Sequence, residues 1–166
     1  MSTITIQWEV IGRVGSRLIV VNNHTVTGIK IPNSKCTIND IPFAEYEDTV
    51  DFVIPSGVTQ IGKEAFSRCS SLESVTIPLS VTTIGNYTFF NCSSLKAIEI
   101  PSSITAIGND AFSKCSSLES VTIPSSVTAI GDYAFDDCNS LKSVRIPPSV
   151  SRIGCNAFPE DCTIIP

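Results

Sequence analysis

The stretch AFSKCSSLESVTIPSSVTAIG, residues 111–131, recurs along the chain with small changes. Its Ile-Pro pair returns at residues 54–55, 77–78, 100–101, 123–124 and 146–147, so successive copies are 23 residues apart. A further pair at residues 31–32 lies one step upstream, and the pair at 165–166 closes a shortened copy. A fixed period of this length predicts a solenoid in which each copy forms one coil.

The apolar positions of the copies keep the same phase. One column of phenylalanines runs through Phe66, Phe89, Phe112, Phe135 and Phe158. A column of glycines runs through Gly62, Gly85, Gly108, Gly131 and Gly154. A single copy has too few apolar residues to bury them, but stacked copies align each column into a continuous core. We therefore expect the phenylalanines to lie at equal depth in one elongated stack.

One half of each copy is predicted to be a strand. In SLESVTIP, residues 71–78, Val75 and Ile77 alternate with Ser74 and Thr76, which is the period of a β-strand. Strands that recur once per coil, with a crossover between them, are expected to pair in parallel and to wind right-handed.

The other half of each copy is predicted to be a short helix or a turn. Four apolar residues at i, i+4, i+5 and i+8 fit one face of a helix, namely Ile61, Ala65, Phe66 and Cys69. The VTxI segment before each glycine fits either a second short strand or an irregular turn. The predicted fold class is α/β, a right-handed solenoid with parallel strands on one side and short helices or turns on the other.

The chain is predicted to have two parts. Residues 1–53 repeat poorly and are expected to form an N-terminal cap, with a strand hairpin followed by a degenerate repeat. ITIQWEV and SRLIVVNN fit the two strands, separated by Gly12 to Gly15, and would cover the open end of the stack. Residues 54–166 are expected to form the repeats and a truncated C-terminal coil.

The pattern LxxVxIPxSVxxIGxxAFxxCSS is found over residues 72–94, with Thr88 in place of the alanine. This pattern resembles the BspA-like class of leucine-rich repeats. The resemblance implies a leucine-rich-repeat solenoid whose parallel strands lie on the concave side and whose short helices or turns lie on the convex side. The resemblance implies a non-enzymatic module of microbial surface adhesion that binds a protein or glycan partner, at the cell surface or secreted. The N-terminus MSTITIQWEVIG does not read as a secretory signal. The alternative is a structural spacer or scaffold segment of a larger protein with no ligand of its own.

Composition excludes several other functions. The net charge of −5, without any run of Lys or Arg, argues against nucleic-acid binding. The longest aliphatic runs, such as residues 18–21, are too short for membrane insertion. The single histidine, His24, belongs to no catalytic motif, so we predict no catalytic residue, no enzyme activity and no cofactor. A monomer is expected.

The seven cysteines do not predict a metal site, because no closely spaced pair such as C-x2-C is present. Four of them share one column, namely Cys69, Cys92, Cys115 and Cys138. Side chains of stacked parallel coils point the same way, which disfavours disulfide geometry, so we expect buried, reduced thiols. Cys36 and Cys155 lie off the column, and either position is compatible with an exposed thiol.

The predicted binding surface is the outer face of the concave sheet, called the strand face below. It comprises Ser74, Thr76, Ala97, Glu99, Ser120, Thr122, Ser143 and Arg145. Beside the strand starts, a column of alternating charge is expected to form a ladder of ion pairs through Glu73, Lys96, Glu119 and Lys142.

A second set of contact candidates lies on the predicted convex side, where three aromatic residues depart from the repeat pattern. These are Tyr87, Phe90 and Tyr133. The last coils also carry an acidic outer edge, formed by Asp132, Asp136, Asp137, Glu160 and Asp161. No loop with the regular oxygen-ligand spacing of a calcium site accompanies it.

Overall fold

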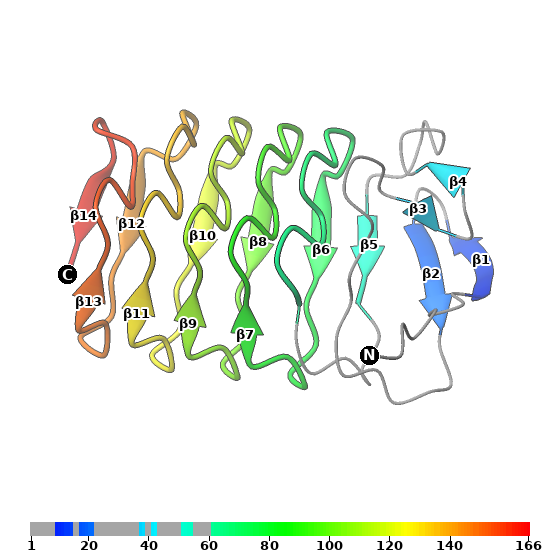
Figure 1. The fold of residues 1–166 in the computed structure, drawn as a ribbon, viewed down its shortest axis with the longest axis horizontal. Coiled ribbons are helices and arrows are strands. Elements are labelled where there is room, and N and C mark those ends of the chain that lie inside the picture. Colours follow the sequence, from blue (N-terminus) through cyan, green and yellow to red (C-terminus); the bar gives the residue numbers. More distant parts are fainter. Residues whose placement is uncertain (1–8, 15–16, 22–36, 39–40, 43–50, 55–60) are drawn as a thin grey trace.

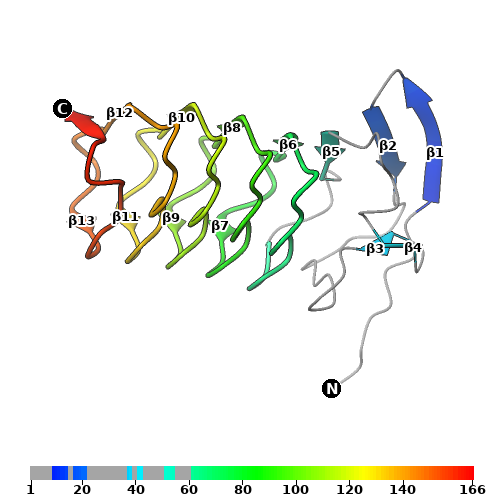
Figure 2. The same cartoon turned by 90° about the horizontal axis from the view of Figure 1, so that it is seen from above.

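The computed structural model describes residues 9–14, 17–21, 37–38, 41–42, 51–54 and 61–166. The repeats form coils stacked along one axis, with the C-terminus at one end and the β1–β2 pair at the other (Figures 1 and 2). Successive coils place short strands on two sides of the stack. The predicted solenoid is therefore confirmed as a stack of parallel-stranded coils.

The first sheet contains one three-residue strand per coil. Its repeat strands are β5 (Asp51–Val53), β6 (Ser74–Thr76), β8 (Ala97–Glu99) and β10 (Ser120–Thr122), all paired in parallel. β12 (Ser143–Arg145) follows beside β10 in the stack and pairs in parallel with β14 (Thr163–Ile165) (Figure 1). Ala97 is in register with Ser74 on one side and Ser120 on the other, so equivalent residues of successive copies are neighbours.

The second sheet shows that the VTxI segments are strands. Its members are β7 (Thr83–Ile84), β9 (Ala106–Ile107), β11 (Ala129–Ile130) and β13 (Arg152–Ile153). All four pair in parallel, in the order β13-β11-β9-β7. Of the two possibilities left open by the sequence, the second short strand is correct.

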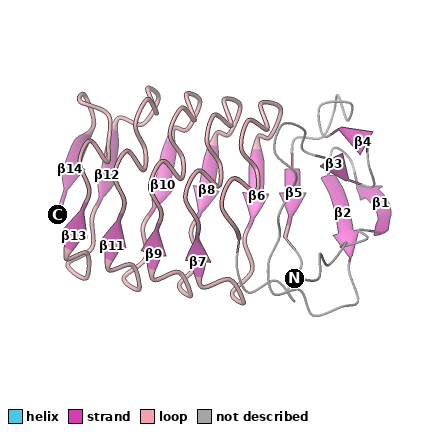
Figure 3. Ribbon diagram, in the orientation of Figure 1, coloured by secondary structure: helices cyan, strands magenta, loops and turns pink. Residues whose placement is uncertain are grey.

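The predicted short helix is wrong, and the alternative of turns is correct. The described residues contain no helix (Figure 3), and residues 63–68 form tight turns. Glu64 and Arg68 have φ of 61° and 64°, whereas a right-handed helix needs φ near −60°. The Phe66 N–H donates to the Thr88 carbonyl of the next coil at 2.7 Å. The segment therefore bonds to its neighbour in the stack, and its internal bonds are those of single turns, such as the Ser67 N–H to the Glu64 carbonyl at 3.1 Å.

The phenylalanine column lies at the centre of the core. The first four rings are fully buried, and the last one, Phe158, is partly buried. Successive rings are 5.0 to 5.2 Å apart between centroids and are inclined by 9° or less. This is the offset stacking that aromatic rings prefer. The expectation of equal depth is confirmed for residues 66 to 135.

The glycine column allows two coils to approach closely at one corner. A Cβ atom built on Gly131 would lie 2.6 Å from the Asn109 nitrogen and 2.7 Å from the Gly108 carbonyl carbon. Contacts this short do not occur for real Cβ atoms. Glycine is required at this position because the two coils come so close together. Its backbone conformation is one that other residues can also adopt.

The N-terminal part extends the first sheet. β1 (Glu9–Val14) pairs antiparallel with β2 (Arg17–Val21), and β2 continues in parallel to β5. β3 (Thr37–Ile38) and β4 (Ile41–Pro42) form a further antiparallel pair. The predicted hairpin is present, but β1 runs through Gly12, so its turn is shorter than the sequence indicated. Residues 4–8 and His24 lie outside the described residues, and the division at residue 53 stays a prediction.

Candidate binding surfaces

The strand face presents the predicted side chains outward. Seven are exposed and Ser74 is half-buried. The residues at the centres of the same strands are buried, namely Val75, Ile98, Val121 and Val144. This confirms the predicted alternation. Whether the face binds a partner stays a prediction.

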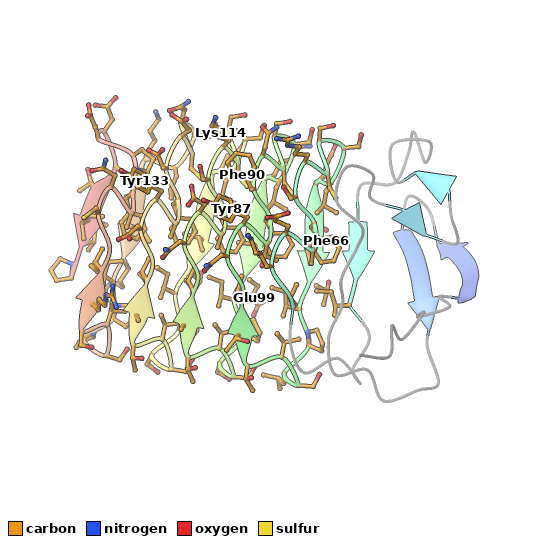
Figure 4. All side chains as sticks on the ribbon, viewed as in Figure 1. Phe66, Tyr87, Phe90, Glu99, Lys114 and Tyr133 are labelled. Atoms are coloured by element: carbon orange, nitrogen blue, oxygen red, sulfur yellow. The ribbon has the colours of Figure 1, made fainter. Side chains whose placement is uncertain are left out.

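The strand face is smooth and carries little charge. Neighbouring strands of a sheet lie about 4.8 Å apart, so one row of the face brings Ser74, Ala97 and Ser120 together. Glu99 is in register with Thr122 and is exposed, as Figure 4 shows near the middle of the stack. Glu99 and Arg145 are the charged members of the predicted set.

The predicted charge ladder forms at its first step. The Lys96 ammonium lies 2.7 Å from a Glu73 carboxylate oxygen, and this hydrogen bond, followed by the charge of Glu73, raises the pKa of Lys96. Lys142 instead donates to the Asn139 carbonyl at 2.9 Å. Both lysines are exposed, so these contacts orient side chains more than they stabilise the fold.

A second surface, the turn face, is formed by the tight turns: residues 63–68 and their equivalents in later coils. Here Tyr87 and Phe90 meet edge to face, with 5.8 Å between ring centroids. The Lys63 ammonium lies 5.8 Å from the Tyr87 centroid, and that of Lys114 lies 5.5 Å from the Phe90 centroid. Both are cation–π contacts. The cluster therefore connects three successive coils, and Figure 4 shows Phe90 and Tyr87 below Lys114.

Electrostatics and backbone geometry both distinguish Tyr87. The charge of Asp110 and a hydrogen bond with it raise the pKa of Tyr87. Tyr87 and Tyr133 have φ of 57° and 55°, a region in which a bulky residue is an outlier. Asn156 holds the same position in a later coil, and asparagine and aspartate enter this region more readily. The two tyrosines are therefore not there because the turn prefers them.

The cysteine column is confirmed as buried thiols in three coils. Cys92, Cys115 and Cys138 are buried and free. Their thiols donate to the carbonyls of phenylalanines in the preceding coil at 3.1 Å, in the pairs Cys92–Phe66, Cys115–Phe89 and Cys138–Phe112. Each thiol thus satisfies a carbonyl inside the core.

Neighbouring thiols and burial keep Cys115 and Cys138 protonated. The Cys115 thiol, and then burial, raises the pKa of Cys138 far above its ordinary value. At Cys115, the contact with Cys138 lowers the pKa, but the contact with Cys92 together with burial outweighs it, so its pKa is also well above the ordinary value. Because thiolates are the reactive form, these cysteines are chemically inert.

Cys69 departs from the prediction. It is buried but disulfide-bonded, and its partner lies outside the described residues. Parallel side chains of stacked coils disfavour a disulfide only between partners within the column, and the other described cysteines of the column are free. Cys36 lies outside the described residues, whereas Cys155 is free and exposed.

A ladder of Asn and Asp side chains, which the repeat pattern did not predict, lies at the corner after the glycines. The Asn86 side-chain oxygen accepts from the Asn109 N–H at 2.9 Å, and that of Asn109 accepts from the Asp132 N–H at 3.1 Å. Asp132 in turn accepts from the Cys155 N–H at 2.9 Å. The sequence does carry a signal for this ladder, because an Asn or Asp directly follows three successive glycines of the column. Ladders of this kind hold neighbouring coils in register.

Neither surface has the features of a metal site or a membrane segment. Among the described residues, no three His, Cys, Asp or Glu side chains are grouped so that they could hold a metal ion. Within the same residues, no helix is long and apolar enough to cross a membrane.

A stack of parallel-stranded coils with repeated inward columns defines a solenoid repeat protein. The chain belongs to the BspA-type leucine-rich repeat family, whose profile matches residues 36–165 in six copies. No curated protein matches the chain.

Solved structures agree with this family. A leucine-rich repeat protein from Bacteroides ovatus is 29% identical, with a TM-score of 0.62 over 99% of this chain and 40% of that one. One from Treponema pallidum is 29% identical, with a TM-score of 0.59 over 90% of this chain and 78% of that one. A leucine-rich cell surface protein from Faecalibacterium prausnitzii is 30% identical, with a TM-score of 0.54 over 97% of this chain and 52% of that one. The chain thus resembles a bacterial cell-surface protein but spans only part of the length of the first and third relatives.

Proposed function

We propose that this chain is a non-enzymatic binding module of a bacterial surface or secreted protein, and that its strand face binds a protein or glycan partner. In this proposal the solenoid is right-handed and the strand face is its concave side. The observation that carries it is the strand face itself. Side chains from four coils are open to solvent on one surface, in a protein similar to a cell-surface relative.

The strand face is held in place by the coils behind it. The Lys96 N–H donates to the Glu73 carbonyl at 3.1 Å, and the Glu119 N–H donates to the Lys96 carbonyl at 2.9 Å, just before the strands. The next residue inward on each strand is buried in the continuous core. A surface that is ordered before binding loses little conformational entropy when a partner docks.

The composition of the strand face points to an extended contact made of many weak interactions. The residues that contribute most of the binding energy at protein interfaces are often Trp, Tyr and Arg. Among the predicted residues of the strand face, Arg145 alone belongs to these types. We therefore expect Glu99 and Arg145 to contribute most to specificity through charge, and the small side chains to allow close approach.

A panel of extracellular proteins and a glycan array, probed with the chain, tests this proposal. Glu99→Lys and Arg145→Glu should each weaken binding to the same ligand and leave the melting temperature unchanged. Thr82→Arg, at an exposed position outside the strand face, is the matched control and should bind normally.

The smooth strand face also favours the second candidate, a spacer or scaffold that binds nothing itself. In that case neither the panel nor the array yields a ligand that the strand-face variants weaken. Ligand binding that all three variants retain equally would contradict the strand face as the site.

A further inference from the structure

The last coil of the stack leaves part of the core exposed. Ile153 and Ile164 are in register with Ile130 and Val144 of the coil before. Ile130 and Val144 are 0% and 2% exposed, whereas Ile153 and Ile164 are 48% and 46% exposed. The last ring of the phenylalanine column, Phe158, is only partly buried. The end coils of a solenoid usually present polar side chains to water, so an apolar end of this kind indicates a contact surface.

The first described repeat is closed on its outer side. Its core residues Ile54, Ile61 and Phe66 are buried, and β5 continues the sheet into β2 and then β1 (Figure 2). Among the described residues, the core is therefore open at the C-terminal end alone. A copy that covers this end with the same end of its own makes an isologous contact, which is complete after two copies.

β14, the last strand of the stack, has a second hydrogen-bonding side that faces away from the coils (Figure 1). The Thr163 N–H donates to the Lys142 carbonyl at 2.9 Å, and the Ile165 carbonyl accepts from the Ile146 N–H at 2.8 Å. Thr163 and Ile165 therefore direct their backbone groups toward β12. Alternate residues of a strand direct these groups to opposite sides, so the N–H and carbonyl of Ile164 point away from β12. Within the described residues, β14 pairs with β12 alone.

A second copy of β14 matches this edge in both backbone and side chain. In an antiparallel ladder, two residues opposite each other can exchange both of their backbone hydrogen bonds. A two-fold axis normal to the sheet, midway between the two Ile164 residues, produces this pair. It also places the two Ile164 side chains next to each other on the core side. Exposed edge strands are templates for such pairing.

We propose that two copies of this chain associate end to end through β14 in this two-fold arrangement. The Ile164 N–H of each copy donates to the Ile164 carbonyl of the other, and Thr163 of each lies opposite Ile165 of the other. The contact removes exposed isoleucine side chains from water. This dimer replaces the monomer expected from the sequence. Because the axis is normal to the sheet, the strand faces of both copies point to the same side of the dimer.

Sedimentation velocity over a range of concentrations tests the dimer and should show a monomer–dimer equilibrium. Ile164→Lys should weaken dimerisation by at least about tenfold, because two like charges then lie directly opposite each other at the axis. Leu79→Lys is the matched control, since it replaces an apolar residue that is 69% exposed and lies outside the last coil. It should dimerise like the wild type. Circular dichroism of each variant at a concentration where it is monomeric checks that the fold is kept.

Amide hydrogen exchange tests the backbone pairing directly. The Ile164 amide should become protected as the dimer forms, whereas the Thr163 amide, which bonds within the chain, should be protected at every concentration. A chain that stays monomeric up to about 1 mM would overturn the proposal and leave this end to a different partner, such as a further coil of a longer protein. Open-ended growth beyond two copies, a folded Ile164→Lys that dimerises normally, or a dimer with an unprotected Ile164 amide would also overturn it. No ligand is present in these measurements, so failure of the dimer and failure of ligand binding by the strand face are distinguishable.

Discussion

The interior columns and the turn face share one backbone but use it differently. Inside, four successive coils carry the same residue at the same depth, namely Phe66, Phe89, Phe112 and Phe135. On the turn face, the column that starts at Glu64 continues with Tyr87, Asp110 and Tyr133, although all four have similar positive φ. An interior residue must fit the copies before and after it, whereas an outer residue has solvent on one side. Repetition therefore encodes the core, whereas the outer positions are free to differ from coil to coil.

Removing one ring from the middle of the stack should have the largest effect on stability. Phe112→Ala removes one of the two stacked neighbours of Phe89 and one of those of Phe135, and truncation of a buried phenylalanine costs about 3–5 kcal/mol. Urea unfolding monitored by circular dichroism measures this change. Phe158→Ala, at a partly buried ring with one stacked neighbour, should cost clearly less. Equal losses at both positions would contradict a continuous column.

Adding one methyl group at the glycine corner should have the next largest effect. In Gly131→Ala the new Cβ meets backbone atoms that cannot rotate away, and overpacking of this kind costs about 1–3 kcal/mol. Thermal unfolding of this variant beside Ser102→Ala, at an exposed position, checks the expectation. Unchanged melting of Gly131→Ala would show that the coils can separate at this corner without loss of stability.

The cysteine column should make the fold sensitive to alkaline pH. The pKa values of Cys115 and Cys138 are raised in the folded chain, so above about pH 8.5 the unfolded chain releases protons that the folded chain keeps. The free energy of unfolding should then fall with rising pH, by about 1.4 kcal/mol per pH unit for each thiol.

Chemical denaturation between about pH 8 and 10 measures this slope in the range where thiols titrate. Cys138→Ala should make the slope less steep, whereas Cys155→Ser, which alters an exposed thiol, should not. An identical slope in all three chains would show that other groups cause the alkaline loss.

The exposed ion pair should have the smallest effect. Lys96→Gln removes the contact with Glu73, and both side chains are well exposed, so the melting temperature should stay within experimental error. The comparison is sharpened if this variant also melts like the wild type in low salt, where exposed charges interact most strongly. A clear loss of stability would mean that the alternating charges fix the register of the coils.

The inward-facing residues could be predicted because a buried position in one coil imposes the same requirement on the next. Val75 and Phe112 were therefore placed correctly from spacing alone. The helix was wrong because spacing shows which residues face inward but not where the backbone hydrogen bonds are made. Glu64 and Arg68 have no strong preference for the left-handed conformation that ends a helix there. The disulfide of Cys69 was missed because its partner lies outside the column.

The outer surface was harder to predict than the core. The aromatic residues could be predicted because they break the repeat pattern. The lysines over their rings could not. Lys63 and Lys114 lie in the coils before and after that of Tyr87 and Phe90, at repeat positions that differ from those of the rings they contact. Contacts between unlike positions depend on how neighbouring coils are offset, which a sequence period does not give. The side chains of the strand face could be predicted because they alternate along each strand with the buried ones.

The glycine corner also permits successive coils to stack closely. The backbone nitrogen nearest to a built Cβ atom lies 2.7 Å away at Gly108, 2.6 Å at Gly131 and 2.3 Å at Gly154, so the room between successive turns narrows toward the C-terminus. A side chain anywhere on this ridge would lengthen the rise per turn and draw the stacked rings out of contact. The glycine of each repeat, its smallest residue, therefore allows the coils to stack this closely.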